Sequence, residues 1–538
     1  MQFIHELHIK TNEEFGRKAV SMLKEFIAGS GIEIRDQAEG DIAADVEFRR
    51  DPVMTRSSAG HYKLRASGGR VLLRYNDSEG ARNAAVAIYR IIAVRTSSAS
   101  PVVFDDCETE DWPDCQYRGV MIDPARVYIP LESVFSTIRQ AALARMNKLN
   151  MHLCDSGRYA IESVRLPELN NQNLRRYNIG EIRQIIDYAD LFGLEVVPHF
   201  DVPAHATHIL DCYPALRCEI DDGTGYSSWA VCAAKEETYD FLEKALEELA
   251  EIFPSELVFL CGDELEFADL PEYDLRLNWQ HCTHCKELSS KNGFNSNTDI
   301  FYHFIRRAHS VLNKHGKRMM LANDNIDISR TPEIPKDILI VYWRIAMEGS
   351  GPVEGCSMER FLEEGFELIN MDYPEAYIDL YMTEEKLCDW SPVKRPYCSG
   401  KYHDQVFGSM ICAWEGKKHY EWTLPSGIIM FGDKLWDFRD KIYDKSYYVE
   451  VLRRLLGPMT PPGLDVFSLL GACLLPLDED SSRMGFPERI SKESLPEIDE
   501  TIRTLEGLID GGLREKDTAA AYLKCLRWMK MQKAGEAQ

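Results

Sequence analysis

The sequence is short of positive charge. Its 538 residues include 62 Lys and Arg against 87 Asp and Glu, a formal net charge of −25 at pH 7. Such a surface would repel a phosphate backbone or an anionic bilayer, so nucleic acid and membranes are poor partners. No stretch approaches the roughly 18 consecutive apolar residues of a membrane span, and the start, MQFIHELHIKTNEEF, has no apolar run of signal-peptide length.

The cysteines follow no disulfide framework. Fifteen is an odd number, and they are spread through a long chain without regular spacing, which predicts reduced thiols and a cytoplasmic location. The segment HCTHC stands apart, because Cys282 and Cys285 with His281 and His284 have half the spacing of a structural zinc site. No second ligand pair is apparent nearby. The sequence therefore favours a reduced pair in a loop, and we predict neither a metal site nor a cofactor.

The chain divides into three regions that differ in their pattern of apolar and polar residues. A hydrophobic content of 45% with 10% aromatics is ordinary for globular proteins. Residues 1–114 mix helical periodicity with short strands and predict an α+β domain without catalytic motifs. Residues 115–443 alternate apolar strands with amphipathic helices, and residues 444–538 predict a helical appendage.

The middle region predicts a (β/α)8 barrel. Short, nearly continuous apolar strands separated by helices are typical of a buried parallel sheet, and eight such units fit a barrel. A doubly wound sheet is the competing α/β architecture, but no glycine-rich phosphate loop follows the first strand. The predicted strands are 117–123, 148–155, 194–201, 257–264, 317–324, 337–344, 366–373 and 407–414.

Acidic and aromatic residues close these strands. The carboxyl ends of barrel strands converge on one face, where active sites lie. A single Asp after a strand is ordinary turn chemistry, but its recurrence predicts a functional site on this face. The residues concerned are Asp123, Asp155, Asp201, Asp263 with Glu264, Asp324, Trp343, Asp372 with Tyr373, and Trp414 with Glu415.

The neighbouring pair Asp263 and Glu264 indicates glycosidase chemistry of a particular kind. Most glycosidases place two carboxyl groups on opposite sides of the scissile bond. Adjacent residues at a strand end cannot easily do so. A division of labour suits them better, in which one protonates the leaving oxygen and the other holds a group of the substrate that attacks the anomeric carbon, as the acetamido oxygen of a 2-acetamido sugar can.

Three segments in order along the chain resemble the family 20 glycoside hydrolases, the β-N-acetylhexosaminidases. YRGVMIDPARVYIP (117–130) is similar to their R-G-x-x-x-D-x-x-R-x-x-x-P motif, and DLFGLEVVPHFDVPAHATHIL (190–210) to their G-x-x-V-x-P-x-x-D-x-P-G-H segment. FPSELVFLCGDELEF (253–267) is similar to the strand carrying the catalytic Asp–Glu pair. The resemblance runs through most of residues 116–440, and it implies the barrel and the preceding α+β domain.

The resemblance implies a role for each matching acid and histidine. Glu264 would be the general acid/base, and Asp263 would hydrogen-bond the acetamido N–H and stabilise the oxazolinium-like intermediate. Asp155 and His205 would lie close to the sugar and to the catalytic pair. Behind them, the residues that orient the pair would be Asp201, His152 and Asp324.

It also implies a set of sugar-binding residues. Arg118 would bind ring hydroxyls, with a salt bridge at the other end of the barrel as the alternative. Trp343 and Trp414 would stack on the sugar. Tyr373 would donate to the acetamido carbonyl, with Tyr377 as a competing choice, and Glu415 would accept from a hydroxyl. Asp123 and Arg126 are expected to form a structural ion pair.

Two departures from the family pattern indicate a divergent member. Ala322 or Asn323 stands where the family has a Trp, so one wall of the acetamide site is missing or supplied from elsewhere. Trp414 and Glu415 are adjacent, whereas the family motif is Trp-x-Glu, which weakens the role of Glu415.

The resemblance implies a retaining exo-acting β-N-acetylhexosaminidase, with an amino-sugar oligosaccharide or glycoconjugate as its partner. The alternatives are a non-catalytic carbohydrate-binding barrel and a glycosidase releasing a disaccharide or a sulfated amino sugar. A third is a glycosidase using Asp324 or Glu415 as nucleophile. The sequence does not decide whether the sugar is GlcNAc or GalNAc. It also leaves the oligomeric state open, including a homodimer.

Overall fold

The structure is a computed structural model of the chain. It describes residues 5–11, 13–28, 32–37, 44–54, 59–95, 104–170, 174–219, 226–265, 279–327, 330, 333–343, 358–372, 376–377, 390–393, 405–414, 420–438 and a few single positions beyond 498.

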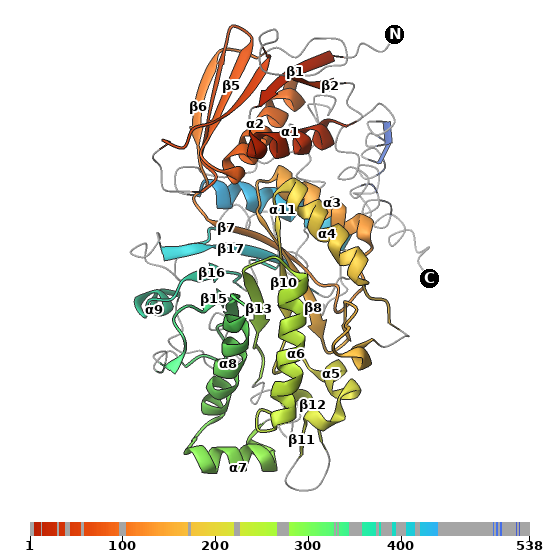
Figure 1. Ribbon diagram of the computed structural model, residues 1–538, viewed down its shortest axis with the longest axis vertical. Coiled ribbons are helices and arrows are strands. Elements are labelled where there is room, and N and C mark those ends of the chain that lie inside the picture. The colour runs from red at the N-terminus through yellow and green to blue at the C-terminus, as the bar shows by residue number, and fades with distance from the viewer. Residues whose placement is uncertain are drawn as a thin grey trace.

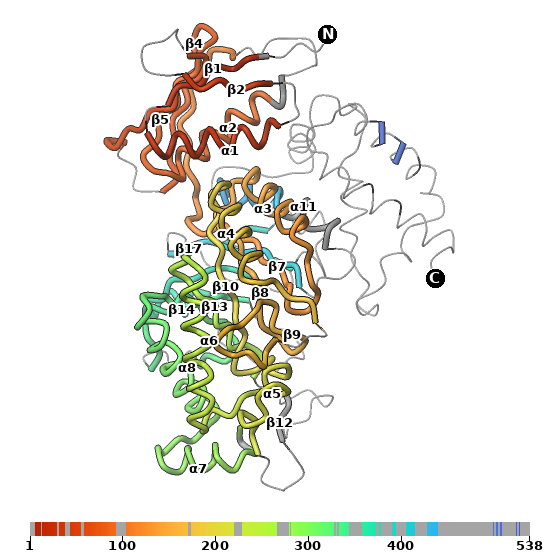
Figure 2. Tube along the Cα trace, turned by 45° about the vertical axis from the view of Figure 1, so that its right-hand side comes forward, coloured from red at the N-terminus to blue at the C-terminus, as the bar shows by residue number. Residues whose placement is uncertain are grey.

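The amino-terminal region is a six-stranded sheet with two helices. Its strands are β1 (His5–Thr11), β2 (Ile32–Gln37), β3 (Val46–Arg50), β4 (Tyr62–Ser67), β5 (Arg70–Tyr75) and β6 (Cys107–Asp111), in the order β2-β1-β3-β5-β4-β6. Helices α1 (Glu14–Ile27) and α2 (Ser78–Arg95) lie between this sheet and the rest of the molecule (Figures 1 and 2). The predicted α+β fold of the amino-terminal region is therefore confirmed.

Eight parallel strands close into a barrel, as predicted. They are β7 (Tyr117–Ile122), β8 (Lys148–Asp155), β10 (Glu195–Phe200), β13 (Leu257–Cys261), β14 (Arg318–Ala322), β15 (Leu339–Tyr342), β16 (Leu368–Asn370) and β17 (Val406–Ala413). Each pairs with its neighbours in the sequence, and β7 also pairs with β17, which closes the ring. The predicted range of β8 ends where the strand does, and the other seven end one to three residues later because they included the acidic or aromatic residues that follow the strands.

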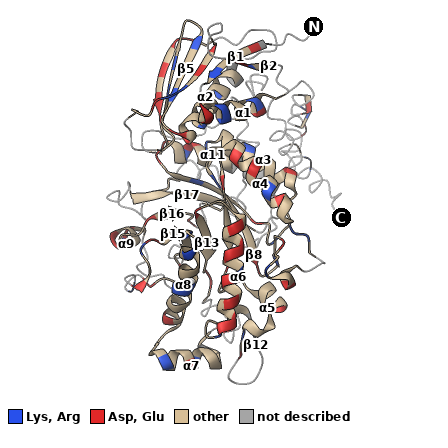
Figure 3. Cartoon of the chain, viewed as in Figure 1, with Lys and Arg blue, Asp and Glu red and all other residues tan. Residues whose placement is uncertain are grey.

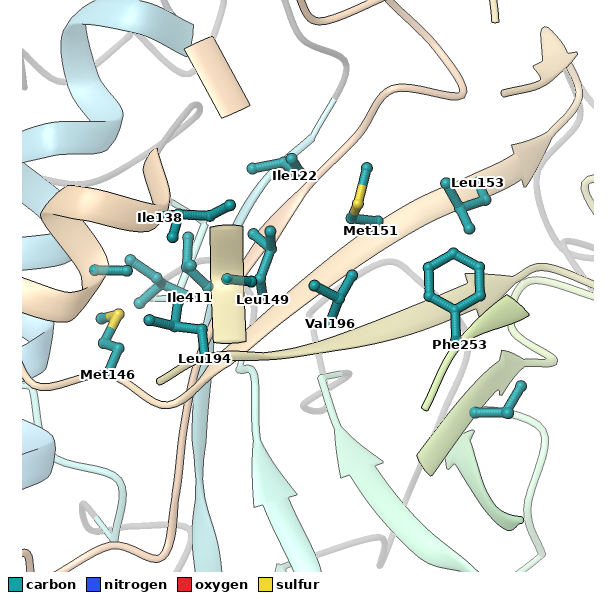
Figure 4. Close-up of a cluster of buried hydrophobic side chains, with 14 of the residues drawn as sticks. Ile122, Ile138, Met146, Leu149, Met151, Leu153, Leu194, Val196, Phe253 and Ile411 are labelled. Carbon is teal, nitrogen blue, oxygen red and sulfur yellow. The ribbon is translucent and has the colours of Figure 1, made fainter. Parts of the chain in front are cut away.

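Helices cover the outside of the barrel. They are α3 (Leu131–Leu143), α4 (Ile179–Phe192), α6 (Glu236–Ile252), α8 (Asn297–Lys314), α9 (Met358–Glu363) and α11 (Tyr420–Trp436). Local sequence marks their ends: Asn178 and Glu181 form a capping box at the start of α4, and Gly193 ends that helix with a φ of 77°. Apolar side chains of strands and helices, such as Leu149 and Ile138, meet between the two layers (Figure 4).

The interior of the barrel has its own apolar core. Inward-facing side chains from all the strands except β8 fill it, and they include large residues such as Tyr117, Phe259 and Met410. This filling makes the barrel a solid support rather than a pore. Ligand chemistry is therefore confined to its ends.

Two connections at the carboxyl ends of the strands carry extra elements. After β10 come α5 (Thr207–Cys212), η2 (Pro214–Leu216) and the antiparallel pair β11 (Arg217–Glu219) and β12 (Tyr226–Val231). After β13 come η4 (Trp279–His281) and α7 (Thr283–Asn292). Both groups lie at the end of the molecule far from the amino-terminal sheet (Figures 1 and 2). Two shorter elements, β9 (Arg158–Tyr159) and η1 (Pro167–Leu169), follow β8.

The predicted helical appendage, 444–538, lies almost wholly outside the described residues, and the few positions described there are helical. The domain boundaries remain predictions. Among the described helices, none has the length and apolar character needed to cross a bilayer.

Part of the acidic charge lies on the outer face of the barrel. Helix α6 carries several acidic residues, which are coloured red in Figure 3. Several of them form ion pairs with basic residues of neighbouring elements, such as Glu236 with Arg307 and Glu247 with Arg165. This part of the charge is ordinary solvated surface and does not mark the site.

Candidate active site

The carboxyl ends of the strands bring together most of the residues predicted from the sequence. Each described member comes from the carboxyl-terminal half of a strand or from the connection that follows it, and β8, β10 and β13 contribute two residues each. The group comprises His152, Asp155, Asp201, His205, Asp263, Glu264, Asp324, Trp343 and Trp414.

An unusual backbone turn presents the pair Asp263 and Glu264. Cys261, Gly262 and Glu264 have φ angles of 63°, 74° and 51°, a region that L-residues seldom occupy. Two hydrogen bonds hold the turn. The Glu264 amide donates to Asp324 Oδ2 at 2.8 Å, and its carbonyl accepts from Trp229 Nε1 at 3.1 Å. Strained residues of this kind persist where the surroundings fix them, and they are concentrated at functional sites.

A buried histidine links Glu264 to Asp155. His205 Nε2 lies 3.0 Å from Glu264 Oε2, and its Nδ1 lies 3.4 Å from Asp155 Oδ2. Burial alone would lower the pKa of His205, but Asp201, Asp155 and Glu264 raise it well above its usual value. Burial likewise opposes the charge on Asp155, yet hydrogen bonds from His152 and His205 and the charge of Arg126 hold the pKa of its carboxyl well below its usual range. His205 is therefore a cation balanced by Asp155.

Asp263 presents a carboxylate oxygen that no described group satisfies. Its side chain is mostly buried, and Oδ1 has no hydrogen-bond partner among the described residues. The nearest cation, His205 Nε2, is 3.8 Å away. Burial, and then the neighbouring Asp263, raise the pKa of Asp201 well above its usual value. A buried acceptor without a partner is costly unless a ligand supplies a donor.

A pair of buried histidines lies under the site. His152 Nε2 is 2.9 Å from Asp155 Oδ2, and the Nδ1 atoms of His152 and His199 are 3.0 Å apart. Burial lowers the pKa of His199 well below its usual value, so it is neutral. If His152 donates to Asp155, then its Nδ1 accepts from His199, and this fixes both tautomers. The pair thereby orients Asp155.

Aromatic rings flank the carboxyl groups. Trp343 Nε1 donates to Asp324 Oδ1 at 3.1 Å, and its ring centroid is 6.5 Å from that of Tyr377. The Trp414 ring lies edge-on to His152 at 5.1 Å and 6.2 Å from Tyr377, and its Nε1 has no partner among the described residues. These three rings form an aromatic wall that faces the acids.

The predicted sugar contact of Arg118 is wrong. This residue is second in β7, at the amino end of the barrel, and only 1% of it is exposed. Its guanidinium donates to the carbonyls of Cys115 and Arg145, each at 2.7 Å, and forms an ion pair with Glu79 of α2. The alternative of a salt bridge at that end is the one observed, because only the carboxyl end of a strand faces the site.

Arg126 is the arginine of the site, and the sequence reasoning undervalued it. Its guanidinium pairs with Asp123 at 3.0 Å and with Asp155 at 2.9 Å, and lies 5.0 Å from the centroid of Trp414. A quarter of its side chain is exposed. The expected ion pair with Asp123 is therefore present, together with contacts to two site residues. The signal that could have identified Arg126 was its position just after β7, since Arg118 stands near the start of that strand.

Two predicted residues, Tyr373 and Glu415, lie outside the described residues. Tyr377, the competing choice to Tyr373, is described, buried and in contact with the aromatic wall. Asn323 accepts from the backbone amide of Trp343 at 2.9 Å.

Trp229 was missed altogether. Besides bonding the Glu264 carbonyl, its ring lies 4.5 Å from that of His205. It belongs to β12 in the connection after β10, and no spacing in the sequence marks that strand.

A closed (β/α)8 barrel with adjacent carboxyl groups after its fourth strand, one of them bonded to a buried histidine, defines a site of the glycosidase class. Residues 115–418 match the family model described as "Glycosyl hydrolase family 20, catalytic domain". The chain belongs to glycoside hydrolase family 20, as the sequence motifs indicated.

Curated relatives agree with this assignment. The chain is 25% identical over 387 residues to a β-hexosaminidase of Vibrio furnissii, covering 66% of this chain and 59% of the relative. It is 25% identical over 380 residues to one from Porphyromonas gingivalis, covering 66% and 47%. The match to human β-hexosaminidase subunit beta is 30% identical over 169 residues, 29% of each chain. The chain thus spans about half the length of these longer bacterial relatives.

Solved structures share the fold. A GH20 exo-β-N-acetylglucosaminidase from Vibrio harveyi, in complex with N-acetylglucosamine, superposes with a TM-score of 0.70 at 20% identity, covering 85% of this chain and 73% of that one. A Flavobacterium johnsoniae chitobiase superposes with a TM-score of 0.71 at 17% identity, covering 99% and 90%. At such identities the likeness concerns the fold alone.

Proposed function

We propose that this protein is a retaining, exo-acting β-N-acetylhexosaminidase that hydrolyses terminal β-linked GlcNAc or GalNAc with assistance from the substrate's own acetamido group. The observation that carries the proposal is the pair of neighbouring carboxyl groups in different settings. Glu264 is partly exposed and bonded to the His205 cation, whereas Asp263 is mostly buried with an unpartnered oxygen. Two carboxyls with different surroundings suit two different tasks.

Glu264 would act as the general acid and then as the general base. When it gives its proton to the leaving oxygen, it becomes a carboxylate, and His205 at 3.0 Å stabilises the new negative charge. Asp155 keeps His205 charged and oriented. In the second step the same carboxylate takes a proton from the water that opens the oxazolinium.

Asp263 would accept the acetamido N–H. Its Oδ1 lacks a donor, and an amide N–H from the substrate would satisfy it. The same negative charge would stabilise the positive charge of the oxazolinium intermediate. The aromatic wall of Trp343, Tyr377 and Trp414 supplies apolar surface for the sugar, and the partly exposed Arg126 supplies donors for its hydroxyls.

A protein nucleophile fits less well. Of the two candidates for that role, Glu415 lies outside the described residues, and Asp324 accepts from the Glu264 amide through Oδ2 and from Trp343 Nε1 through Oδ1. Both oxygens are thus committed to holding the turn, and neither is free to attack. A carbohydrate-binding barrel without activity would not require the strained turn at Glu264.

Two variants test the proposal on 4-nitrophenyl N-acetyl-β-glucosaminide and the matching galactosaminide. Glu264→Gln should lower kcat about 10²–10⁴-fold, the usual contribution of a general acid. Asp263→Asn should lower it about 10²–10³-fold, because a charged acceptor aimed at the intermediate is lost. Glu251→Gln, an exposed acid on α6 paired with Arg165, is the control and should retain full activity.

Inhibition separates the mechanisms. A thiazoline that mimics the oxazolinium should inhibit the wild type tightly and should still bind Glu264→Gln. A wild type that releases neither sugar, nor a disaccharide or a sulfated amino sugar from its glycosides, would refute the enzymatic function. Turnover that is insensitive to the thiazoline would instead favour a protein nucleophile.

We further propose a cytoplasmic location, supported by the ten described cysteines, none of which forms a disulfide. Cell fractionation with an antibody to the native protein tests it.

A further inference from the structure

Four cysteines from distant parts of the sequence meet beyond the carboxyl end of the barrel. Cys218 lies in β11 and Cys232 directly follows β12, whereas Cys282 precedes α7 and Cys285 is in its first turn. All four are buried, and their sulfur atoms lie within 4.8 Å of one another. Cys282-x-x-Cys285 is the half-site noted in the sequence, and the second pair is contributed by the hairpin of β11 and β12, about 50 residues earlier.

The spacing of the sulfur atoms fits a tetrahedron. Cys232 Sγ is 3.7 Å from Cys282 Sγ and 3.7 Å from Cys285 Sγ. Zinc bound by four thiolates at about 2.3 Å in tetrahedral geometry requires sulfur atoms about 3.8 Å apart. A disulfide would need about 2.05 Å. An iron–sulfur cluster places several irons and sulfides between its thiolates and needs a wider cage.

The surroundings also suit a cation with thiolate ligands. Cys282 is the N-cap of α7 and Cys285 lies in its first turn, so both are at the positive end of the helix dipole, which favours negative sulfur. No side chain caps that end of the helix. Four buried thiols without a metal would be poor hydrogen-bond partners for one another, whereas one ion satisfies all four.

We propose that Cys218, Cys232, Cys282 and Cys285 bind one structural Zn²⁺. The zinc displaces the four thiol protons and forms four Zn–S bonds, so the closed tetrahedral site has no open position for catalysis. Neither histidine of HCTHC belongs to the cluster, and His284 is 37% exposed by side chain and lies 3.3 Å from Glu219. The expectation of no metal site, drawn from the apparent lack of a second pair, is replaced by this proposal.

The site joins two connections that shape the active site. The hairpin belongs to the connection after β10, and α7 to the connection after β13, the strand that precedes Asp263 and Glu264. Trp229 stands three residues before Cys232 and contacts both His205 and the Glu264 carbonyl. Trp279, three residues before Cys282, donates to the Val231 carbonyl at 2.8 Å. The zinc therefore fixes the strand that carries Trp229.

Metal analysis of untagged protein tests the site without reference to activity, so its failure is distinct from failure of the proposed function. Elemental analysis of protein from cells grown without added metal should give one zinc per chain. X-ray absorption at the zinc edge should show four sulfur ligands at about 2.3 Å. Protein with no zinc, zinc with nitrogen or oxygen ligands, iron in place of zinc, or a disulfide between any two of the four would overturn the proposal.

Variants assign the zinc to these residues. Cys285→Ser and Cys218→Ser should lose far more than the about 10–100-fold in zinc affinity that loss of an outer partner costs. Cys212→Ser is the matched control, because Cys212 lies in the same insertion, on α5, outside the cluster. A zinc content of Cys285→Ser equal to that of the wild type would also overturn the assignment.

A mercurial reagent with a colorimetric zinc indicator provides a measurement on the wild type alone, in case the variants do not fold. Titration should release zinc in step with modification of the four thiols. Hydrogen exchange after release should speed up in the β11–β12 hairpin but not in β1–β6. Zinc release without modification of these thiols would contradict the proposal.

Discussion

The link between His205 and Glu264 yields the sharpest test of the proposed mechanism. We consider His205→Asn. The residue has a φ of 51°, a left-handed conformation that Asn tolerates better than most side chains. The shorter amide can still donate to Asp155 from a position near that of Nδ1, but it cannot reach Glu264 as Nε2 does at 3.0 Å. The change thus removes one interaction and keeps its neighbour.

The magnitude follows from the nature of that interaction. His205 is a buried cation, and in the proposed mechanism it lies beside the carboxylate that forms when Glu264 protonates the leaving oxygen. A hydrogen bond to a charged group contributes about 1.5–3 kcal/mol, and if it acts only in the transition state its loss lowers kcat about 10- to 150-fold. KM should change little, because the interaction does not involve the bound sugar.

The assay compares two leaving groups. With a 4-nitrophenyl glycoside the leaving oxygen needs little protonation, so the loss should be smaller than with N,N′-diacetylchitobiose, whose leaving sugar needs the acid fully. His208→Asn is the control: His208 is equally buried, but its Nε2 lies 3.3 Å from the Leu169 carbonyl. Equal losses on both substrates, or a loss no greater than that of His208→Asn, would refute the reasoning.

Two further predictions concern arginines and pH. Arg118→Met should leave KM unchanged but lower the free energy of unfolding by about 3–5 kcal/mol, because the mostly buried carboxylate of Glu79 loses its guanidinium partner. Arg126→Met should instead raise KM, and steady-state kinetics with thermal unfolding of both variants checks the contrast. The folded-state pKa of His205 is raised, so its contribution to stability is complete below the unfolded pKa of about 6.5 and is lost as pH rises through the folded value. The folded-state pKa of Asp155 is lowered, so its contribution is complete above the unfolded pKa of about 3.9 and is lost as pH falls through the folded value. Urea unfolding across pH should show that His205→Asn loses less stability at alkaline pH than the wild type does. An identical loss in the two proteins would contradict the assignment of His205 as a cation.

Much of the barrel could be predicted because its signals are local. Apolar runs of strand length, amphipathic helices between them and the acids that close them are all read within about ten residues. Asp155, Asp201, Asp263 and Asp324 were found because the parallel topology brings every carboxyl end to one face.

The errors came from interactions between distant segments. Arg118 and Arg126 stand eight residues apart in one motif, and only their places along β7 decide that the first pairs with Glu79 and the second meets Trp414. Trp229 could not be found, because nothing in its neighbourhood predicts a contact with His205.

The sequence by itself determined the architecture, the family and the neighbouring pair Asp263 and Glu264, since periodicity and short motifs encode them locally. Only the tertiary structure decided which arginine serves the site, how His205 joins Asp155 to Glu264, and that Cys218 and Cys232 complete the half-site of Cys282 and Cys285. The physical reason is the same in each case. These contacts join side chains from separate strands or connections, and their distances are set by closure of the barrel, not by spacing along the chain.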